Sequence, residues 1–287
     1  MASAIRLAVS QLPELTRRLE RFFPLSLKAY YLAQSVHGGQ WSGVEFVVDD
    51  WPDFGALVYR PAKGSDGKHF SKFTAKNYGL YGESRERLTR LLSIPGIVNW
   101  EKDAIFSAVR VETELDALRD ATGERGKLVD GEPARMYYRE IDEQLPDCSL
   151  PDGWTATKIP QDAVGKLMQN WAFGTTEGAE EYIKQCLQFP SCALWDAKGE
   201  MMGCLMSHEY GSNGLLFVDK SVRRQGVALE LAHRLQKAML EAGRKNTFVY
   251  AAYSNEAAHQ FAHATGFSVV PKGDSLRCYY TPASAKL

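Results

Sequence analysis

This sequence lacks the marks of several protein classes. No apolar run approaches the roughly 18 residues that a membrane-spanning helix needs, and no N-x-[ST] glycosylation sequon occurs. The five cysteines are odd in number and form no C-x-x-C pair, so neither a disulfide framework nor a structural zinc site is expected, and a reducing compartment is favoured. With 34 basic against 35 acidic residues, the net charge of −1 leaves no basic excess for binding nucleic acid.

The chain of 287 residues is long enough for two domains. Residues 143–153 contain two prolines, three acids and a glycine, which is the composition of a linker. We therefore expect an N-terminal domain over residues 1–145 and a C-terminal domain over residues 154–287. Helical and strand patterns alternate in both, so the fold class is α+β.

The first half is expected to begin with an amphipathic helix over residues 11–23. We prefer this to the alternative that the acid-poor N-terminus is a mitochondrial targeting segment. A turn is expected at Trp51–Phe54, because Pro52 disfavours helical geometry at Trp51 and has no N–H donor. The other expected strands are 27–36, 44–48, 55–60, 76–81 and 134–140, and the other expected helices are 83–92 and most of 101–120.

The second half predicts the element order β-α-α-β-β-β-α-β-α-β-β. At its centre, the apolar residues 215–218 predict a buried strand, residues 219–226 a basic turn, and residues 227–242 a helix. Such a turn can hold a phosphate, because the first N–H groups of a helix lack internal partners and lie at the positive end of its dipole. Gly226 lets the backbone approach a ligand closely, and Arg223 and Arg224 add permanent positive charge.

Taken alone, this turn is better explained as a solvated helix cap, but two resemblances favour a ligand. The spacing of Arg223, Gly226 and Ala228 resembles the acyl-CoA pyrophosphate loop of the GNAT (Gcn5-related) N-acyltransferases, whose element order the second half also shares. From about Leu12 to Phe267 the chain resembles, more narrowly, the glycine N-acyltransferase family. The blocks that carry this resemblance are Ser26-Leu27-Lys28-x-Tyr30, Val48-Asp49-x-Trp51-Pro52-Asp53-Phe54, Val98-Asn99-Trp100, Phe189-Pro190-x-Cys192 and Tyr253-Ser254-Asn255-Glu256-Ala257.

The resemblance implies a GNAT fold in the C-terminal half, packed with an N-terminal α+β domain that is a candidate for a second GNAT-like domain. It implies an enzyme that transfers an acyl group from coenzyme A to the amine of glycine or another small amino acid. Acyl-CoA would be a co-substrate, with no permanently bound cofactor. A monomer is expected, and the implied location is mitochondrial, with the cytoplasm as the alternative.

The expected acyl-CoA site follows the central strand into the helix. The edge of Leu216–Asp219 could pair with the pantetheine amides as an added strand, and an N–H of Phe217 or Val218 could face the thioester oxygen. The residues expected to bind acyl-CoA are Phe217, Val218, Arg223, Arg224, Gln225, Gly226, Val227, Ala228 and Asn255.

The expected catalytic base departs from the family pattern. The family places a glutamate eleven residues before the first arginine of the loop, and this chain has Ser212 there, which cannot act as that base. Glu209 is the candidate substitute. Because neighbouring strand residues point to opposite faces, at most one of His208 and Glu209 is expected to face the site.

The expected acid also departs from the pattern of many GNAT enzymes, because Ala262 replaces their tyrosine. Tyr253 and His263 are the candidate substitutes. His259 and His263 have the i, i+4 spacing of metal ligands but lack a third ligand in the sequence, so no metal site is expected.

Two other functions remain open from the sequence. One is an acyl-CoA-binding protein with little or no catalysis, which the serine at position 212 would explain. The other is a protein lysine acyltransferase, which the same fold permits.

Overall fold

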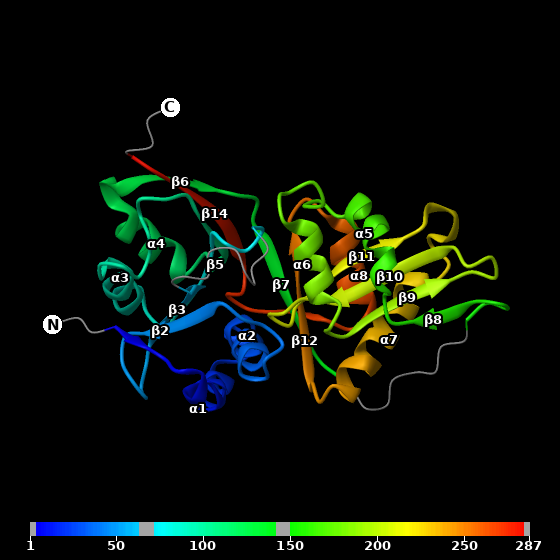
Figure 1. Cartoon of the computed structure of the whole chain (residues 1–287), viewed down its shortest axis with the longest axis horizontal. Coiled ribbons are helices and arrows are strands. Elements are labelled where there is room, and N and C mark those ends of the chain that lie inside the picture. The colour runs from blue at the N-terminus through cyan, green and yellow to red at the C-terminus, as the bar shows by residue number, and fades with distance from the viewer. Residues whose placement is uncertain (1–3, 63–71, 142–149, 284–287) are drawn as a thin grey trace. The chain divides into compact units, whose positions relative to one another are not determined.

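The computed structural model describes residues 4–62, 72–141 and 150–283, which form two compact units (Figure 1). The first unit comprises Met1–Met136, Ala252–Ser254 and Val269–Leu287. The second comprises Tyr137–Ala251 and Asn255–Ser268. In the described part of the chain, every helix is too short or too polar to cross a bilayer.

These units divide the chain differently from the expected boundary at residues 143–153, most of which lies outside the described residues. The division falls within strand β7 (Ala134–Glu140), and strand β14 (Ser275–Pro282) belongs to the first unit. The reason is strand pairing, because β14 pairs with β5 (Ala104–Arg110) along most of its length. A linker composition marks where a chain is exposed, but it carries no information about the strand with which a distant segment pairs.

The first unit is built on a sheet with the strand order β1-β2-β3-β4-β5-β14, and β6 also pairs with β14. Neighbours are antiparallel except β4 and β5, which are parallel. The remaining strands of this sheet are β1 (Ile5–Arg6), β2 (Val44–Val48), β3 (Ala56–Pro61), β4 (Asn77–Gly82) and β6 (Gly126–Asp130). The helices are η1 (Val9–Gln11), α1 (Leu12–Leu19), η2 (Glu20–Phe22), α2 (Leu27–His37), α3 (Arg85–Ser93), α4 (Glu114–Thr122) and η3 (Gly123–Arg125).

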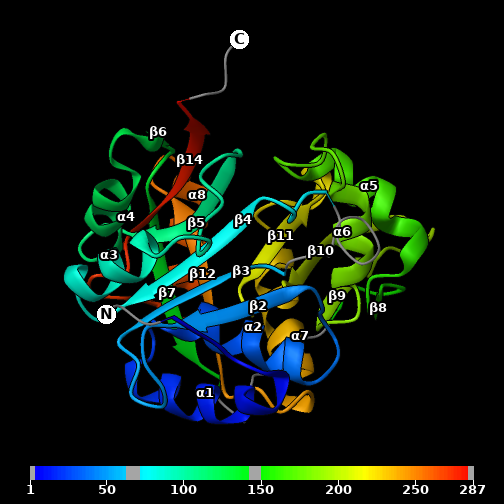
Figure 2. The same ribbon diagram turned by 60° about the vertical axis from the view of Figure 1, so that its left-hand side comes forward.

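Helices α3 and α4 pack side by side against this sheet (Figure 2). Leu88, Leu91 and Leu118 on the helices and Val58 and Phe106 on the strands are fully buried in one core. Each such side chain contributes about 1.5–3 kcal/mol by leaving water. This core therefore holds the first unit together without any ligand.

Two elements of the first unit differ from the sequence prediction. Residues 27–36 were expected as a strand, and the structure has the helix α2 there. Its buried residues include Leu27, Ala29, Tyr31, Ala33 and Ser35, which recur every two residues as in a strand, whereas Gln34 and His37 are exposed. The composition nevertheless favours a helix, since Leu, Ala, Lys and Gln are good helix formers. Most of residues 101–120 was expected as a helix, but residues 104–110 form β5 because they pair with β14. That partner lies far along the chain, at Ser275–Pro282, so the local pattern gives no sign of it.

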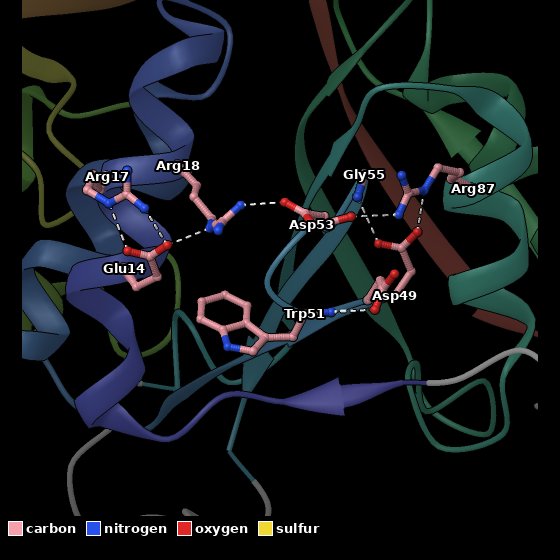
Figure 3. Close-up of polar contacts among 9 residues, drawn as sticks. Glu14, Arg17, Arg18, Asp49, Trp51, Asp53, Gly55 and Arg87 are labelled. Atoms are coloured by element: carbon pink, nitrogen blue, oxygen red, sulfur yellow. Dashed lines mark hydrogen bonds and ion pairs between the residues drawn. The ribbon is translucent and has the colours of Figure 1, made fainter.

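The turn expected at Trp51–Phe54 is present, and polar contacts connect it to both neighbouring helices (Figure 3). Asp49 accepts hydrogen bonds from the backbone N–H of Gly55 at 2.9 Å and from Nε of Arg87 on α3 at 2.6 Å. Asp53 accepts from Arg18 on α1 at 2.6 Å. In the structure these hydrogen bonds join the turn to α1 and α3 within the first unit.

Glu14 on α1 binds Arg17 and also Arg18, the arginine that contacts Asp53. Its carboxylate accepts from Nε of Arg17 at 2.8 Å and from Nε of Arg18 at 2.6 Å (Figure 3). The hydrogen bond from Arg17 and then that from Arg18 lower the pKa of Glu14 to about 2.

The second half of the chain has the element order that the sequence predicts, and all of it but the end of β12, the end of β13 and β14 lies in the second unit. Its strands β8 to β11 form an antiparallel sheet in the order β11-β10-β9-β8, and β12 pairs with β7. The strands are β8 (Thr155–Thr157), β9 (Ser191–Trp195), β10 (Met201–Ser207), β11 (Asn213–Val218), β12 (Asn246–Ala252) and β13 (Ser268–Val269). The helices are η4 (Gln161–Ala163), α5 (Val164–Asn170), α6 (Ala179–Cys186), η5 (Lys220–Val222), α7 (Val227–Glu241) and α8 (Glu256–Ala264).

Helix α7 is placed by its apolar face. Val227, Leu231, Leu235 and Met239 recur every four residues, and all are buried in one core with residues of β9 and β10. Figures 1 and 2 both show α7 against one face of the four-stranded sheet, with α5 and α6 against the other. This packing fixes the start of α7 directly after β11, where the basic turn lies.

Candidate active site

Strand β11 has an irregular backbone at its centre. Cys204 of β10 pairs with Phe217, but Met206 pairs with Gly214, so β11 carries one extra residue between these pairs. Leu215 takes up this residue with φ of 56°, a left-handed conformation that is uncommon outside glycine. A bulge of this kind interrupts the hydrogen-bond ladder between β10 and β11. Backbone groups near Leu215 are thereby turned away from β10 and can bind a ligand.

The other edge of β11 runs beside β12 for only one residue pair. Among the described residues, the backbone pairing there is an isolated parallel bridge between Ser212 and Phe248, beside which the Thr247 hydroxyl donates to Oδ1 of Asn213 at 3.0 Å. Because β11 is an edge strand of its sheet, backbone groups from Leu216 to Val218 can accept an added strand or an amide-bearing chain. Phe217 and Val218, the expected acyl-CoA contacts, pair with Cys204 and Gly203 on the β10 side.

The basic turn after β11 has the geometry of an anion-binding loop. Asp219 accepts from the backbone N–H of Ser221 at 2.9 Å and from its hydroxyl at 2.7 Å, and these bonds lower the pKa of Asp219. Arg224 has φ of 64° and Gly226 has φ of 83°. Alternating backbone conformations of this type direct successive N–H groups to one side of a loop.

The arginines of the turn are exposed, as a phosphate site requires. Arg223 donates from Nε to the carbonyl of Val218 at 3.1 Å, and Gln225 donates to the carbonyl of Ser221 at 3.2 Å. These contacts fix the turn against the end of β11. Gly226 then serves as the N-cap of α7, so the free N–H groups of Val227 and Ala228 lie at the positive end of a 15-residue helix.

At the opposite end of β11, the expected base position is buried. Ser212 is 3 % exposed and its hydroxyl donates to the carbonyl of Asn213 at 3.2 Å. The preceding residues His208 and Glu209 both reach Tyr182 of α6: its hydroxyl lies 2.8 Å from Nδ1 of His208 and donates to Glu209 at 2.7 Å. All three side chains are buried.

The strand alternation expected for His208 and Glu209 does not hold here, because both side chains contact Tyr182; that at most one of them faces the acyl-CoA site stays a prediction. The alternation of side chains holds only within a strand, and β10 ends at Ser207. His208 to Gly211 form a turn closed by the N–H of Gly211 donating to the carbonyl of His208 at 2.9 Å. The chain reverses there, so consecutive side chains can meet on one side.

Sequence reasoning missed the partners of this pair. The Tyr182 and His208 rings lie with centroids 5.9 Å apart, and Tyr210 stacks on His208 with centroids 5.2 Å apart. Trp171 stacks on Tyr182 at 5.9 Å. The only sequence signal for Tyr182 was its place on the apolar side of the helix predicted at 177–189, which is equally typical of a core residue.

Tyr253 and Asn255 have structural partners of their own. The hydroxyl of Tyr253 donates to Asp274, and its ring lies 5.1 Å from the Arg135 guanidinium, all within the first unit. The bond to Asp274 raises the pKa of Tyr253, which weakens it as a proton donor. Asn255, in the second unit, caps α8 by accepting from the N–H of Ala258 at 3.1 Å. A catalytic role for Tyr253 and an acyl-CoA contact for Asn255 stay predictions.

One group of side chains could hold a metal ion, and it does not include His259 and His263, where no metal site was expected. Cys186, His208 and Glu209 bring one donor atom each to within 4.8 Å of one another, alone in this respect among the described residues. Burial raises the pKa of the Cys186 thiol well above its usual range, so the sulfur is protonated at neutral pH. His259 and His263 instead contact Tyr137, whose hydroxyl lies 2.8 Å from Nδ1 of His259.

Comparison with known sequences decides the family. The sequence profile described as aralkyl acyl-CoA:amino acid N-acyltransferase matches residues 7–190, more than half of the chain, and an FR47-like profile matches residues 193–275. The chain belongs to the aralkyl acyl-CoA:amino acid N-acyltransferase family. Human glycine N-acyltransferase-like protein 2 is 21 % identical over 276 residues, which cover 90 % of this chain and 92 % of that protein.

Solved structures give the fold of this acyltransferase. A Drosophila protein matches with a TM-score of 0.77 at 13 % identity, covering 99 % of this chain and all of that one. A GCN5-related N-acetyltransferase from Sphaerobacter thermophilus matches with a TM-score of 0.55 at 14 % identity, covering 98 % of this chain and 95 % of that one. The predicted α+β GNAT fold is thereby confirmed, as is the prediction of an acyltransferase that N-acylates amino acids from acyl-CoA.

Proposed function

We propose that this protein transfers the acyl group of an acyl-CoA to the amine of glycine or another small amino acid, and that it does so in mitochondria. The observation that carries the proposal is the continuous unit of β11, basic turn and α7. It presents an irregular strand edge, two exposed arginines and a free helix N-terminus in that order along the chain. The glycine named in the human relative supports the choice of acceptor.

Each part of this unit suits one part of the donor. The pyrophosphate would bind the N–H groups of Val227 and Ala228 and the side chains of Arg223 and Arg224. The amide-bearing pantetheine arm would pair with the edge at Leu216–Val218, which directs the thioester toward the bulge. A backbone N–H at the bulge that faces the thioester oxygen would stabilise the developing oxyanion by about 3 kcal/mol.

The amine must lose a proton to form the amide. An amine with a pKa near 10 is less than about 1 % neutral at pH 7.5, so a nearby base matters. The coenzyme A thiolate, with a pKa close to that of cysteine at about 8.5, leaves without a strong acid. The reaction therefore depends more on a proton acceptor than on the missing tyrosine at Ala262.

The proposed function is tested by release of free thiol from acetyl-, benzoyl- and longer acyl-CoA, each offered with glycine, glutamine and other small amines from pH 7 to 9.5. Turnover with one or more amino acids is expected. No thiol release anywhere on this grid would refute it. Fractionation of expressing cells tests the location, with co-purification with mitochondria expected.

Ser212 motivates a second candidate, an acyl-CoA-binding protein without catalysis. Its signature would be tight acyl-CoA binding by calorimetry together with no turnover on any amine. Labelling of protein lysines by labelled acyl-CoA in a lysate would instead indicate a protein acyltransferase. The substitution Ser212→Glu separates these candidates further. If the rate of thiol release by Ser212→Glu exceeded that of wild type more than about tenfold, the wild-type enzyme would lack a base at this position.

A further inference from the structure

A half-buried lysine on α5 reaches β11 from the side opposite α7. The Nζ atom of Lys166 donates to the carbonyl of Met201, at the start of β10, at 2.9 Å. The same Nζ lies 5.9 Å from the centroid of the Phe217 ring on β11. These two contacts hold a positive charge beside the strand that is expected to carry the thioester.

The charge of Lys166 is not used in an ion pair with any residue that the structure describes, unlike that of Lys184, which pairs with Glu180 at 2.6 Å. The carboxylate of Asp219 is held by two hydrogen bonds from Ser221, and these lower its pKa more than the charge of Lys166 does. An ammonium group has three hydrogens, and the bond to Met201 uses one. Lys166 can therefore donate to a ligand without giving up its protein contact.

The two faces of β11 differ in what covers them. On one face, Val218 packs into the apolar core that contains Leu231 of α7. Successive strand residues point to opposite faces, so Phe217 and its cross-strand neighbour Cys204 lie on the face toward α5 (Figures 1 and 2). The core fills the α7 face, and the donor is expected along the strand edge. The α5 face is therefore the side from which an acceptor approaches the thioester.

An amino acid makes a demand on this face that a simple amine does not. Its carboxylate is separated from the amine by one carbon, so it lies close to the thioester when the amine attacks. Taking a carboxylate out of water is costly unless a donor, best of all a cation, binds it. The N–H of Phe217 is one of the expected donors to the thioester oxygen, and Lys166 lies beside the ring of that same residue. The lysine is thus placed where the acceptor's carboxylate must go.

We propose that Lys166 binds the carboxylate of the acceptor amino acid, and that this contact makes the enzyme prefer amino acids to simple amines. This rests on the proposed function. The ammonium donates to the carboxylate, while the carbonyl of Met201 and the ring of Phe217 keep the lysine in place. Arg223 and Arg224 of the basic turn bind the phosphates of the donor, so the two substrates are held by different cations.

A pair of acceptors with and without a carboxylate tests the proposal. Thiol release by wild type and by Lys166→Met is measured with glycine and with glycinamide, or with the corresponding pair for the amino acid of highest turnover. Each acceptor is compared between the two enzymes, so the different basicity of the two amines cancels. For glycine, Lys166→Met should lower kcat/KM about 10–100-fold, mainly by raising KM. For glycinamide, kcat/KM should change less than about twofold, which also shows that the variant is folded.

The exposed Lys184 on α6 provides the matched control. Its ammonium is paired with Glu180, so Lys184→Met should leave kcat/KM for both acceptors within about twofold of wild type. Equal losses of kcat/KM with glycine and glycinamide in Lys166→Met would overturn the proposal, because the lysine would then support the fold or the donor. A rise in the acyl-CoA dissociation constant of Lys166→Met, measured by calorimetry, that matches its loss with glycine would also overturn it in favour of a donor contact.

Product inhibition gives a second readout that does not require glycinamide to react. The N-acylglycine product carries the same carboxylate, so its inhibition constant should rise about 10–100-fold in Lys166→Met and stay unchanged in Lys184→Met. An unchanged constant in Lys166→Met contradicts the proposal. A wild type that releases no thiol with any amine refutes the proposed function itself. That result differs from a wild type that turns over glycine while Lys166→Met does so equally well, which refutes the role of Lys166 alone.

Discussion

Alanine at position 226 should weaken acyl-CoA binding through the backbone alone. Gly226 has φ of 83°, and a Cβ built there meets no heavy atom within 4 Å. The cost of Gly226→Ala is therefore conformational, about 1–2 kcal/mol for a left-handed residue with a Cβ. The surrounding turn is exposed, so we expect it to relax and turn its N–H groups away from the phosphates.

Binding must then restore the left-handed conformation, and the dissociation constant rises by up to the strain energy, about 5–30-fold for 1–2 kcal/mol. The helix offers its own control. Gly243, just after the other end of α7, has φ of 78° and also has open space around its Cβ. Gly243→Ala should lower the free energy of unfolding by a similar about 1–2 kcal/mol without changing acyl-CoA affinity.

The assay is titration calorimetry with coenzyme A and an acyl-CoA, alongside urea unfolding of both variants. Wild-type affinity of Gly226→Ala for acyl-CoA, or an equal loss of acyl-CoA affinity in Gly243→Ala, would refute this explanation. Gly226→Asn provides a graded case, because asparagine tolerates the left-handed region better than alanine and should bind with an intermediate constant.

Three further predictions concern charge. Arg224→Ala should raise the acyl-CoA dissociation constant about three- to tenfold at low salt and less at high salt. The control Arg90→Ala, at another exposed arginine, should leave this constant unchanged. Equal effects of the two substitutions would show that Arg224 does not bind acyl-CoA. Arg60→Met leaves the buried carboxylate of Glu45 without its 2.6 Å partner, and urea unfolding should show a loss of about 3–5 kcal/mol; a loss below about 1 kcal/mol would mean the pair is dispensable. Glu14→Gln should unfold at lower urea than wild type at pH 6. Since the folded-state pKa of Glu14 is lowered to about 2, this difference is present above about pH 4.5 and closes as the pH falls toward 2; a pH-independent difference contradicts the ion-pair account.

The sequence alone determined the features that follow from local periodicity and turn chemistry. Residues 215–242 pass from an apolar strand through a glycine-bearing turn to a helix with one apolar face, and the structure has β11, a left-handed Gly226 and α7 there. The predicted burial of residues 215–218 was wrong, because β11 is an edge strand whose residues are only partly buried and whose Leu216 is exposed. The element order of the second half followed for the same reason, since each hairpin and cap has its own signal, such as Asn255 at the start of α8. The phosphate loop was predictable because all its parts are neighbours in the chain.

Only the tertiary structure decided what depends on distant partners. Whether residues 104–110 form a strand depends on β14. Residues 27–36 form a helix that packs against α1, although buried residues recur there every two positions, as in a strand. The same holds for the site. His208 and Glu209 were visible in the sequence, but Tyr182 joins them from 26 residues earlier, across a helix and two strands. A hydrogen-bonded contact of this kind is a property of packed groups, and no pattern along one strand can specify it.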